Sequence, residues 1–225
     1  MNRLSMAHIH LEDGSFSLLW VIIWWAAAIV LVGISLYLLR SGKGTDSRKI
    51  TLAAFCTAAT FAIFQVEIPV AGGIHLSITP LVGILAGPAA GCLIVFVVNI
   101  MNAAIGHGGW SMIGANTLVN ITEVLVAFLL FSLLGKITQS PFARAAIATF
   151  GALVCGTIVM VGIILVSGVQ GVTQDSATIL AGLSLVIAIN LAVAVLESMI
   201  TGFVVTFLQR VRPDILAGTQ KKPGR

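Results

Sequence analysis

Long apolar stretches recur along this chain from near its first residue to near its last, and they constrain its fold more than any other feature. Hydrophobic residues make up 58% of the sequence and charged residues only 9%, whereas soluble domains carry roughly 25% charged residues. No polar block is long enough to fold in water by itself. Because a chain inside a bilayer must satisfy its backbone hydrogen bonds internally, the pattern predicts an all-α, multi-pass membrane protein in the cell membrane.

Helix-breaking residues divide the apolar sequence into seven helical segments, six of them long enough to cross a membrane fully or nearly so. The apolar run Leu18–Leu39 is too long for a signal-peptide core, and no small-residue cleavage site follows it, so we expect it to be retained. The segment 76–86 would rise only ~16 Å as a helix, against a hydrocarbon core of about 30 Å. We therefore expect a half-helix buried in protein, with Gly87-Pro88 reversing the chain. The expected segments are 16–39, 50–66, 76–86, 89–105, 113–134, 143–166 and 179–208.

The basic residues predict the orientation, because cytoplasmic loops of membrane proteins are enriched in Lys and Arg. Four bases lie in the loop 40–49, and placing this loop in the cytoplasm puts the N-terminus outside. If 76–105 crosses twice, the C-terminus is cytoplasmic and only Arg3 of the twelve Lys and Arg lies outside. The bases flank the spans and do not interleave with aromatic residues. They therefore indicate contact with membrane lipid and no binding of nucleic acid.

This topology gathers all four histidines on the outer side of the membrane. Several carboxylates fall on the same side, while nearly all basic residues fall on the other. An outer face rich in imidazole and carboxylate, without competing cations, suits a metal cation that arrives from outside. These outer residues are His8, His10, His75, His107, Glu12, Asp13, Glu67 and Asp175.

The segment Met6-Ala7-His8-Ile9-His10 precedes the first span and holds two of the four histidines. A histidine second from a free amine forms a chelate through the amine, its own deprotonated amide and its Nδ1. Square-planar nitrogen donors of this kind suit Ni(II) or Cu(II). The alternative is a short polar tail with two solvated histidines.

Two further histidines lie in glycine-rich loops. His75 follows Gly72-Gly73, which let the backbone bend and present the imidazole to a cavity; the alternative is a loop histidine at the membrane surface. His107 lies in a Gly-His-Gly-Gly sequence, whose glycines can matter more than the imidazole. Asn116 follows this loop, and we expect it to support a metal ligand through a hydrogen bond. Other asparagines at membrane depth are expected to join helices.

Glu123 and Glu197 are expected inside the membrane, where carboxylates are costly and often functional. For Glu197, a structural hydrogen bond or a contact with a partner protein is as plausible as a place on an ion path. The chain lacks a Walker A sequence, an HExxH motif and a Ser/His/Asp arrangement. We therefore expect no enzyme activity, and uphill transport would draw its energy from another subunit or an ion gradient.

Several motifs together resemble a known family of membrane transport components, across nearly the whole chain. The outer loop and half-helix of the family correspond to His75-Leu76, Thr79, Leu81, Gly83-Ile84-Leu85 and Gly87-Pro88, and its glycine loop corresponds to Gly106-His107-Gly108-Gly109 and Gly114-Ala115-Asn116. Its last helix corresponds to Glu197, Thr201-Gly202-Phe203 and Arg210-Val211-Arg212-Pro213. Its N-terminal signature corresponds to His10-x-x-Asp-Gly14. The chain thus resembles the cobalt/nickel substrate-binding (S) components of energy-coupling-factor ABC transporters, the CbiM and NikM family.

The resemblance implies an S-component fold with the N-terminus inserted into the outer cavity. In the family, the N-terminal amine, the amide and imidazole of the second residue and a loop histidine hold the ion. The loop histidine corresponds to His75. The other histidine is His10 by the Asp-Gly register and His8 by the free-amine chemistry. The second assignment expects translation to start at Met6, so that removal of this methionine leaves the amine on Ala7.

The implied function is that of a membrane substrate-capture subunit of an ATP-driven cobalt or nickel importer. It would bind one Co²⁺ or Ni²⁺ outside, with no resident cofactor and no catalytic residues. The implied partners are a coupling transmembrane subunit, two ATPase subunits and a small membrane accessory subunit. We expect an outer metal-binding segment at 1–15, a transmembrane domain at 16–210 and a basic tail at 211–225. The alternatives are an S component for another small substrate and a secondary metal transporter.

Overall fold

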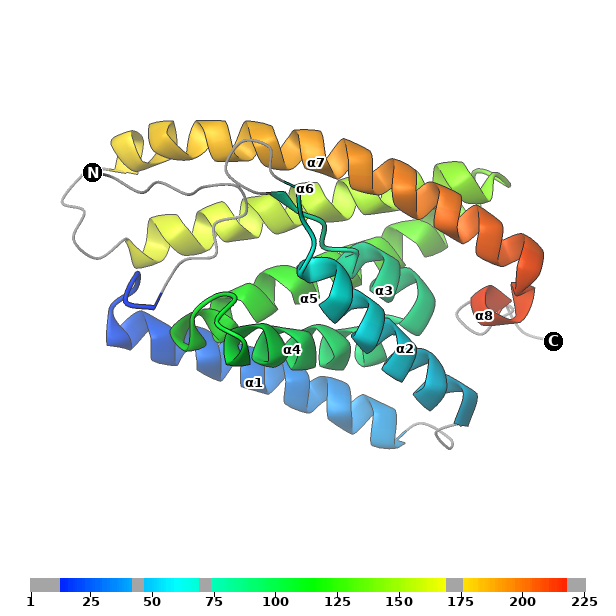
Figure 1. The fold of residues 1–225 in the computed structure, drawn as a ribbon, viewed down its shortest axis with the longest axis horizontal. Helices are drawn as coiled ribbons and strands as arrows, with labels where there is room; N and C mark the ends of the chain where they lie inside the picture. The colour runs from blue at the N-terminus through cyan, green and yellow to red at the C-terminus, as the bar shows by residue number, and fades with distance from the viewer. Residues whose placement is uncertain (1–12, 42–46, 69–73, 169–175, 218–225) are drawn as a thin grey trace.

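The computed structural model describes residues 13–41, 47–68, 74–168 and 176–217. These residues form long helices with one small β-hairpin (Figure 1). The all-α prediction of about seven helical segments is confirmed, with two short helical turns in addition, η1 and α8; the orientation of the termini in the membrane stays a prediction. The elements are α1 (Leu18–Ser41), α2 (Ser47–Phe64), β1 (Glu67–Ile68), β2 (Ile74–His75), α3 (Thr79–Ala86), α4 (Pro88–Ala104), η1 (Trp110–Met112), α5 (Ile113–Leu134), α6 (Pro141–Ser167), α7 (Ser176–Val211) and α8 (Pro213–Ala217).

Four of these stretches are long and apolar enough to cross a membrane: α1, η1 with α5, α6, and the part of α7 from Val186 to Val211. Two shorter apolar helices, in α2 and α4, bring the number to the six expected from sequence. Large apolar side chains on their outer faces are exposed, among them Leu18 at 74% and Phe207 at 62%. Lipid tails rather than water would cover such surfaces. The protein is a multi-pass membrane protein.

The buried half-helix expected at 76–86 is α3, which begins three residues later than expected, at Thr79. Seven of its eight residues are buried, and it packs between α4 and α5. Gly87, with φ 80°, ends α3, and Pro88 begins α4, which runs back toward the start of α1 (Figure 1). Gly83 lets α3 lie directly on α5, because a Cβ there would be 3.0 Å from the carbonyl carbon of Val124.

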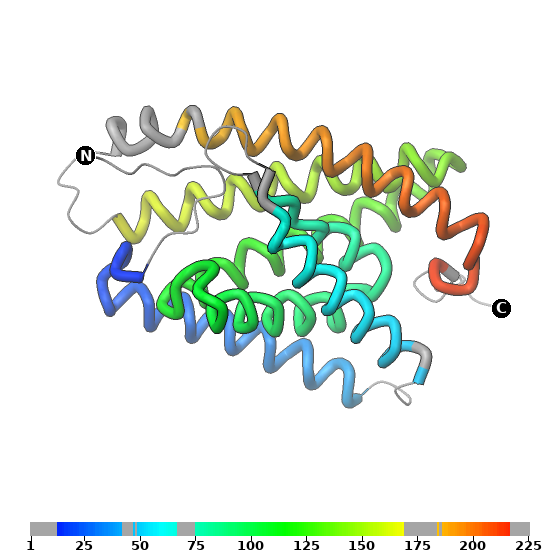
Figure 2. Tube along the Cα trace, in the orientation of Figure 1, coloured from blue at the N-terminus to red at the C-terminus, as the bar shows by residue number. Residues whose placement is uncertain are grey.

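Helix α5 lies at the centre of the bundle and contacts α1, α3, α4 and α6, while α7 packs along α6 (Figures 1 and 2). The last turn of α1 carries Arg40, the first turn of α2 carries Lys49 and the last turn of α7 carries Arg210. All three helix termini lie at one end of the molecule (Figure 1). This segregation of basic residues is the one that the charge pattern predicts for a cytoplasmic face.

Helical structure continues beyond residue 208, where the last span was expected to end. Helix α7 continues to Val211, and α8 follows after Arg212. Asp214 in the first turn of α8 accepts two hydrogen bonds from the Arg212 guanidinium, at 2.9 and 2.8 Å. Leu216 is buried in the main core cluster. Part of the basic segment 211–225 is therefore packed against the transmembrane domain.

Candidate metal site

Two histidines from separate loops meet in the structure. The imidazole rings of His75 and His107 lie 4.5 Å apart between centroids, at an interplanar angle of 90°. His75 ends strand β2, where it is opposite Glu67 of β1, and its side chain is 92% buried. The hairpin therefore directs His75 into the protein rather than to the membrane surface, which was the alternative considered from sequence.

Helix ends fix the position of His107. Its backbone N–H donates to the carbonyl oxygen of Asn102, at 2.9 Å, and the flanking Gly106 and Gly108 have φ values of 80° and 84°. The buried side chain of Asn102 accepts a hydrogen bond from Gln65 Nε2 at 2.8 Å. Asn102 thus joins the end of α4, the end of α2 and the His107 loop.

Two asparagines near the site, Asn102 and Asn116, were considered from sequence. Sequence reasoning placed Asn102 among asparagines that join helices, and its link to His107 was missed because it uses a backbone carbonyl. Asn116, expected to support a ligand, lies half-buried in the first turn of α5. Its role at the metal site stays a prediction.

Asp13 attaches the segment before α1 to the glycine loop. Its Oδ1 accepts hydrogen bonds from the Ser111 backbone N–H at 2.8 Å and from Ser111 Oγ at 2.6 Å. These bonds hold the pKa of Asp13 below its usual value, because they stabilise the carboxylate. Gly109 is required at this contact, since a Cβ there would be 2.7 Å from the Asp13 backbone nitrogen. The aspartate of the His-x-x-Asp-Gly signature therefore has a defined docking partner.

Tryptophans hold α1 against the neighbouring helices. Trp24 Nε1 donates to Ser167 Oγ at the end of α6, at 2.8 Å, and Trp25 Nε1 donates to the Trp110 carbonyl oxygen, at 3.2 Å. Gly114 allows this approach, because a Cβ there would be 2.5 Å from the Trp25 backbone nitrogen. These contacts fix η1, and with it Ser111, relative to α1.

The remaining expected ligands, Ala7, His8 and His10, lie outside the described residues, so their coordination of an ion stays a prediction. Within the described part of the chain, no three His, Cys, Asp or Glu side chains gather closely enough to hold a metal ion. What the structure brings together is one pair of imidazoles.

Two buried carboxylates contact the short stretch between β2 and α3. Glu197 of α7 accepts hydrogen bonds from the Ser77 backbone N–H at 2.8 Å and from Ser77 Oγ at 3.2 Å. Thr79 Oγ1 bonds to Glu123 Oε2 of α5. The structural hydrogen bond considered for Glu197 from sequence is therefore present.

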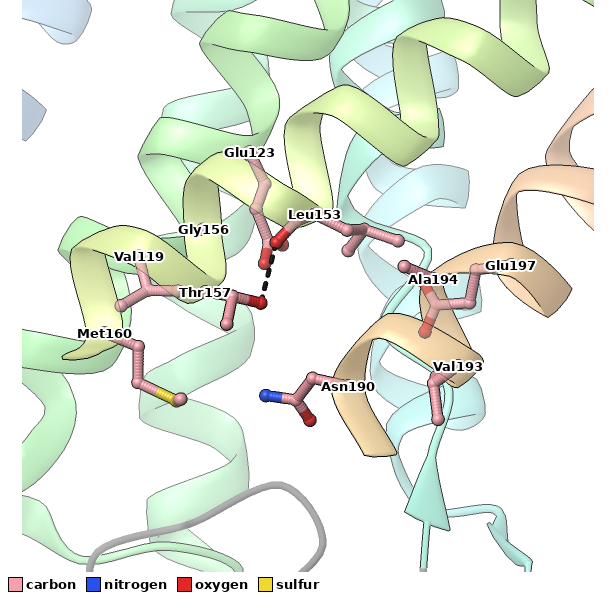
Figure 3. A pocket seen from close by; sticks show the side chains of 10 residues that line it. All are labelled: Val119, Glu123, Leu153, Gly156, Thr157, Met160, Asn190, Val193, Ala194 and Glu197. Atoms are coloured by element: carbon pink, nitrogen blue, oxygen red, sulfur yellow. Dashed lines mark hydrogen bonds between the residues drawn. The ribbon is translucent and has the colours of Figure 1, made fainter. Parts of the chain in front are cut away.

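A small pocket of about 50 Å³, partly open at the protein surface, lies between α5, α6 and α7. Figure 3 shows Glu123 and Thr157 on one side of it and Asn190 and Glu197 on the other. Thr157 Oγ1 donates to the Leu153 carbonyl oxygen within α6, at 2.9 Å. The buried acids thus border this pocket while they hold the loop that follows His75.

Comparisons with known proteins agree along almost the whole chain. The chain is 30% identical over 218 residues to the cobalt transport protein CbiM of Sorangium cellulosum, covering 92% of this chain and 94% of that protein. It is 28% identical over 217 residues to a protein of Archaeoglobus fulgidus described as a candidate fused nickel transport protein, NikMN, covering 92% and 68%.

A solved structure described as a transition metal transporter has the same fold. Its TM-score is 0.77 with 17% sequence identity, and the match covers 96% of this chain and all of that chain. The family described as "CbiM: Cobalt uptake substrate-specific transmembrane region" matches residues 10–215. This match spans most of the chain, and it includes His75, His107 and the Asp13 contact. The protein is therefore a member of the CbiM family.

Proposed function

We propose that this chain is the substrate-capture subunit of a cobalt or nickel importer. It binds one divalent ion at the outer face of the membrane and releases it inward when partner subunits hydrolyse ATP. The relatives named above are described as cobalt and nickel transport proteins, and the family description concerns cobalt uptake. This shared description supports the same class of cargo for this chain.

The observation that supports the proposal is the meeting of three separate segments: the β1–β2 hairpin, the glycine loop with η1, and the segment before α1. His75 and His107 are in contact, and Ser111, four residues after His107, binds Asp13. His10 is three residues from Asp13, so the extended chain between them spans at most about 11 Å. The docking of Asp13 therefore attaches the segment before α1 next to the glycine loop that carries His107, where the predicted N-terminal ligands would act.

The donor chemistry suits the proposed cargo. Imidazole nitrogen binds both Co²⁺ and Ni²⁺, and a chelating N-terminal amine and amide would add further nitrogen donors. Affinity order alone does not set the choice between the two ions. The sequence has no Walker A motif, so ATP hydrolysis would be carried out by two ATPase subunits that act through a coupling transmembrane subunit.

Metal titration of the purified full chain tests the capture site. After removal of metal by chelator, calorimetry with Ni²⁺ or Co²⁺ should show one ion per chain. His75→Ala should weaken binding by more than about 100-fold, since support residues alone typically account for 10–100-fold. Single His8→Ala and His10→Ala variants identify which of the two is the ligand. Ser132→Ala, which loses only a hydrogen bond within its own helix, serves as the control.

Transport assays test the dependence on partners. Vesicles that contain this chain alone should not accumulate Ni²⁺ or Co²⁺, and vesicles that also contain the coupling subunit and both ATPases should accumulate it with ATP. Accumulation by the chain alone, abolished by collapse of an ion gradient, would instead identify a secondary transporter.

A further inference from the structure

The three residues after β2 contain a strained backbone position. Ile78 has φ 41° and ψ 11°, the left-handed helical conformation, which is a genuine outlier for a β-branched residue. Within the described part of the chain it is the only non-glycine residue with a positive φ. Ile78 lies between His75 and α3, so its conformation sets how the backbone at His75 is oriented relative to the half-helix. Such a conformation persists only where its surroundings enforce it.

Two buried carboxylates hold this position from both sides. Glu197 binds the backbone N–H and the hydroxyl of Ser77, and Glu123 binds the hydroxyl of Thr79. The two hydroxyls also bond to each other, at 2.9 Å between Thr79 Oγ1 and Ser77 Oγ. The residues on either side of Ile78 are thus attached to α7 and α5, which belong to different parts of the bundle. We call the set Ser77, Thr79, Glu123 and Glu197 the carboxylate clamp.

The space for this arrangement is provided by a small residue on α6. A Cβ at Gly156 would be 2.5 Å from Glu123 Oε1 and 2.7 Å from its Cγ. Glu123 and Glu197 are only 7% and 2% exposed. Buried carboxyl groups inside a membrane are costly, so their bonds to a strained loop point to a specific task for that loop.

The hydrogen bonds of the clamp require a proton on one of its two carboxyl groups. Three contacts link Glu123 Oε2, Thr79 Oγ1, Ser77 Oγ and Glu197 Oε2 in a row. Each contact needs one proton, and each hydroxyl supplies only one. The third proton must therefore lie on a carboxyl group, so at least one of Glu123 and Glu197 is protonated. A glutamine at either position would supply an amide N–H in place of that proton.

We propose that Glu123 and Glu197 are positioning residues for the metal site: the carboxylate clamp holds Ile78 in its left-handed conformation and thereby keeps His75 in the orientation that binds the ion. Movement of α7 relative to α5 would open the clamp, release the strain at Ile78 and turn His75 away from the ion. A movement of α7 caused by partner proteins would thus act on His75 through the clamp. This inference rests on the proposed metal capture through His75.

The test compares variants of Glu197 in the full chain for affinity and for the ligand-field absorption spectrum of bound Ni²⁺. Glu197→Leu leaves the Ser77 N–H without its acceptor and should weaken binding at least about tenfold, which corresponds to ~1.4 kcal/mol, with a changed spectrum. Glu197→Gln keeps an acceptor and supplies the missing proton, so its affinity and spectrum should stay close to those of the wild type. Ser198→Ala, which removes a neighbouring buried hydroxyl outside the clamp, should change neither.

A second variant distinguishes positioning from general support of the fold. Glycine adopts positive φ without steric cost, so Ile78→Gly removes the strain that the clamp opposes. In an Ile78→Gly background, Glu197→Leu should therefore cost much less affinity than it does alone. If Glu197→Leu fails to fold, as judged by circular dichroism and gel filtration, Ser77→Ala in both backgrounds replaces it.

The outcomes separate the two proposals. No metal binding by the wild-type chain would overturn the proposed function. Wild-type binding that is unchanged in affinity and spectrum by Glu197→Leu would overturn the clamp and leave the capture site standing. Loss of affinity in Glu197→Gln equal to that in Glu197→Leu, or an equal cost of Glu197→Leu with and without Ile78→Gly, would also contradict the clamp.

Discussion

The imidazole ring of His75 meets that of His107 edge to face, with 4.5 Å between the ring centroids. The two residues come from the hairpin after α2 and from the glycine loop after α4, on either side of the α3–α4 reversal. Contact between them is therefore a product of the tertiary fold. It places His75, the predicted ligand, against His107, the predicted supporting residue.

Replacement of His107 should weaken metal binding without abolishing it. Both His107→Ala and His107→Phe should lower affinity roughly 10–100-fold, the range typical of residues that support a metal ligand. Phenylalanine keeps a ring against His75 but lacks the nitrogens. Calorimetric titration with Ni²⁺ checks this, and full affinity in His107→Phe would show that the contact is one of packing alone.

Loss of the Asp13 carboxylate should also lower affinity, because the segment that carries the predicted N-terminal ligands would no longer be attached to Ser111. Asp13→Ala is expected to weaken Ni²⁺ binding by no more than about tenfold, because solvent exposure reduces the strength of both hydrogen bonds. Asp13→Asn, which keeps one acceptor oxygen, should have a smaller effect. Equal affinity in wild type and Asp13→Ala would show that docking is unrelated to metal capture.

The docking of Asp13 should be insensitive to pH over the neutral range. Its hydrogen bonds lower the pKa of the carboxyl group in the folded protein. Docking is therefore fully stable above the ordinary aspartate pKa of about 3.9 and is lost as the pH falls through the lower folded value. Hydrogen exchange of the Ser111 amide, expressed as a protection factor, measures this directly. Loss of protection already above about pH 5 would contradict the assignment.

Close packing of α3 on α5 should make Gly83 intolerant of a side chain. Gly83→Ala forces a Cβ to within 3.0 Å of the Val124 carbonyl carbon, and overpacking of this kind typically costs ~1–3 kcal/mol. Gly33→Ala in α1, where nothing lies within 4 Å of the added Cβ, is the matched control. Thermal unfolding in detergent should show a clear loss for the first variant and none for the second.

Helix positions were predicted well from sequence because they depend on local pattern. The limits of α5, 113–134, match the expectation, and the reversal at Gly87-Pro88 follows from the conformational limits of glycine and proline. The buried half-helix was expected from its length alone. Each of these features can be read from a few neighbouring residues.

Contacts within the candidate site could be predicted only in part. The glycines around His107 marked a loop, but nothing local indicated that Ser111 would bind Asp13 or that Asn102 would hold His107. The left-handed Ile78 was not foreseeable, because a β-branched residue disfavours that conformation, and the bonds of Glu197 and Glu123 to its neighbours join residues far apart in the sequence. Long-range hydrogen bonds carry little trace in the local sequence.

The central claim is that this chain captures one cobalt or nickel ion with His75 as a ligand. Native mass spectrometry of the full mature chain, after loading with Ni²⁺ or Co²⁺ and removal of excess metal, tests it most directly, because the same spectrum gives the mass of the chain and the number of bound ions. We expect one ion per wild-type chain and none retained by His75→Ala. Absence of bound metal in the wild type, or an equal metal content in His75→Ala, would contradict it.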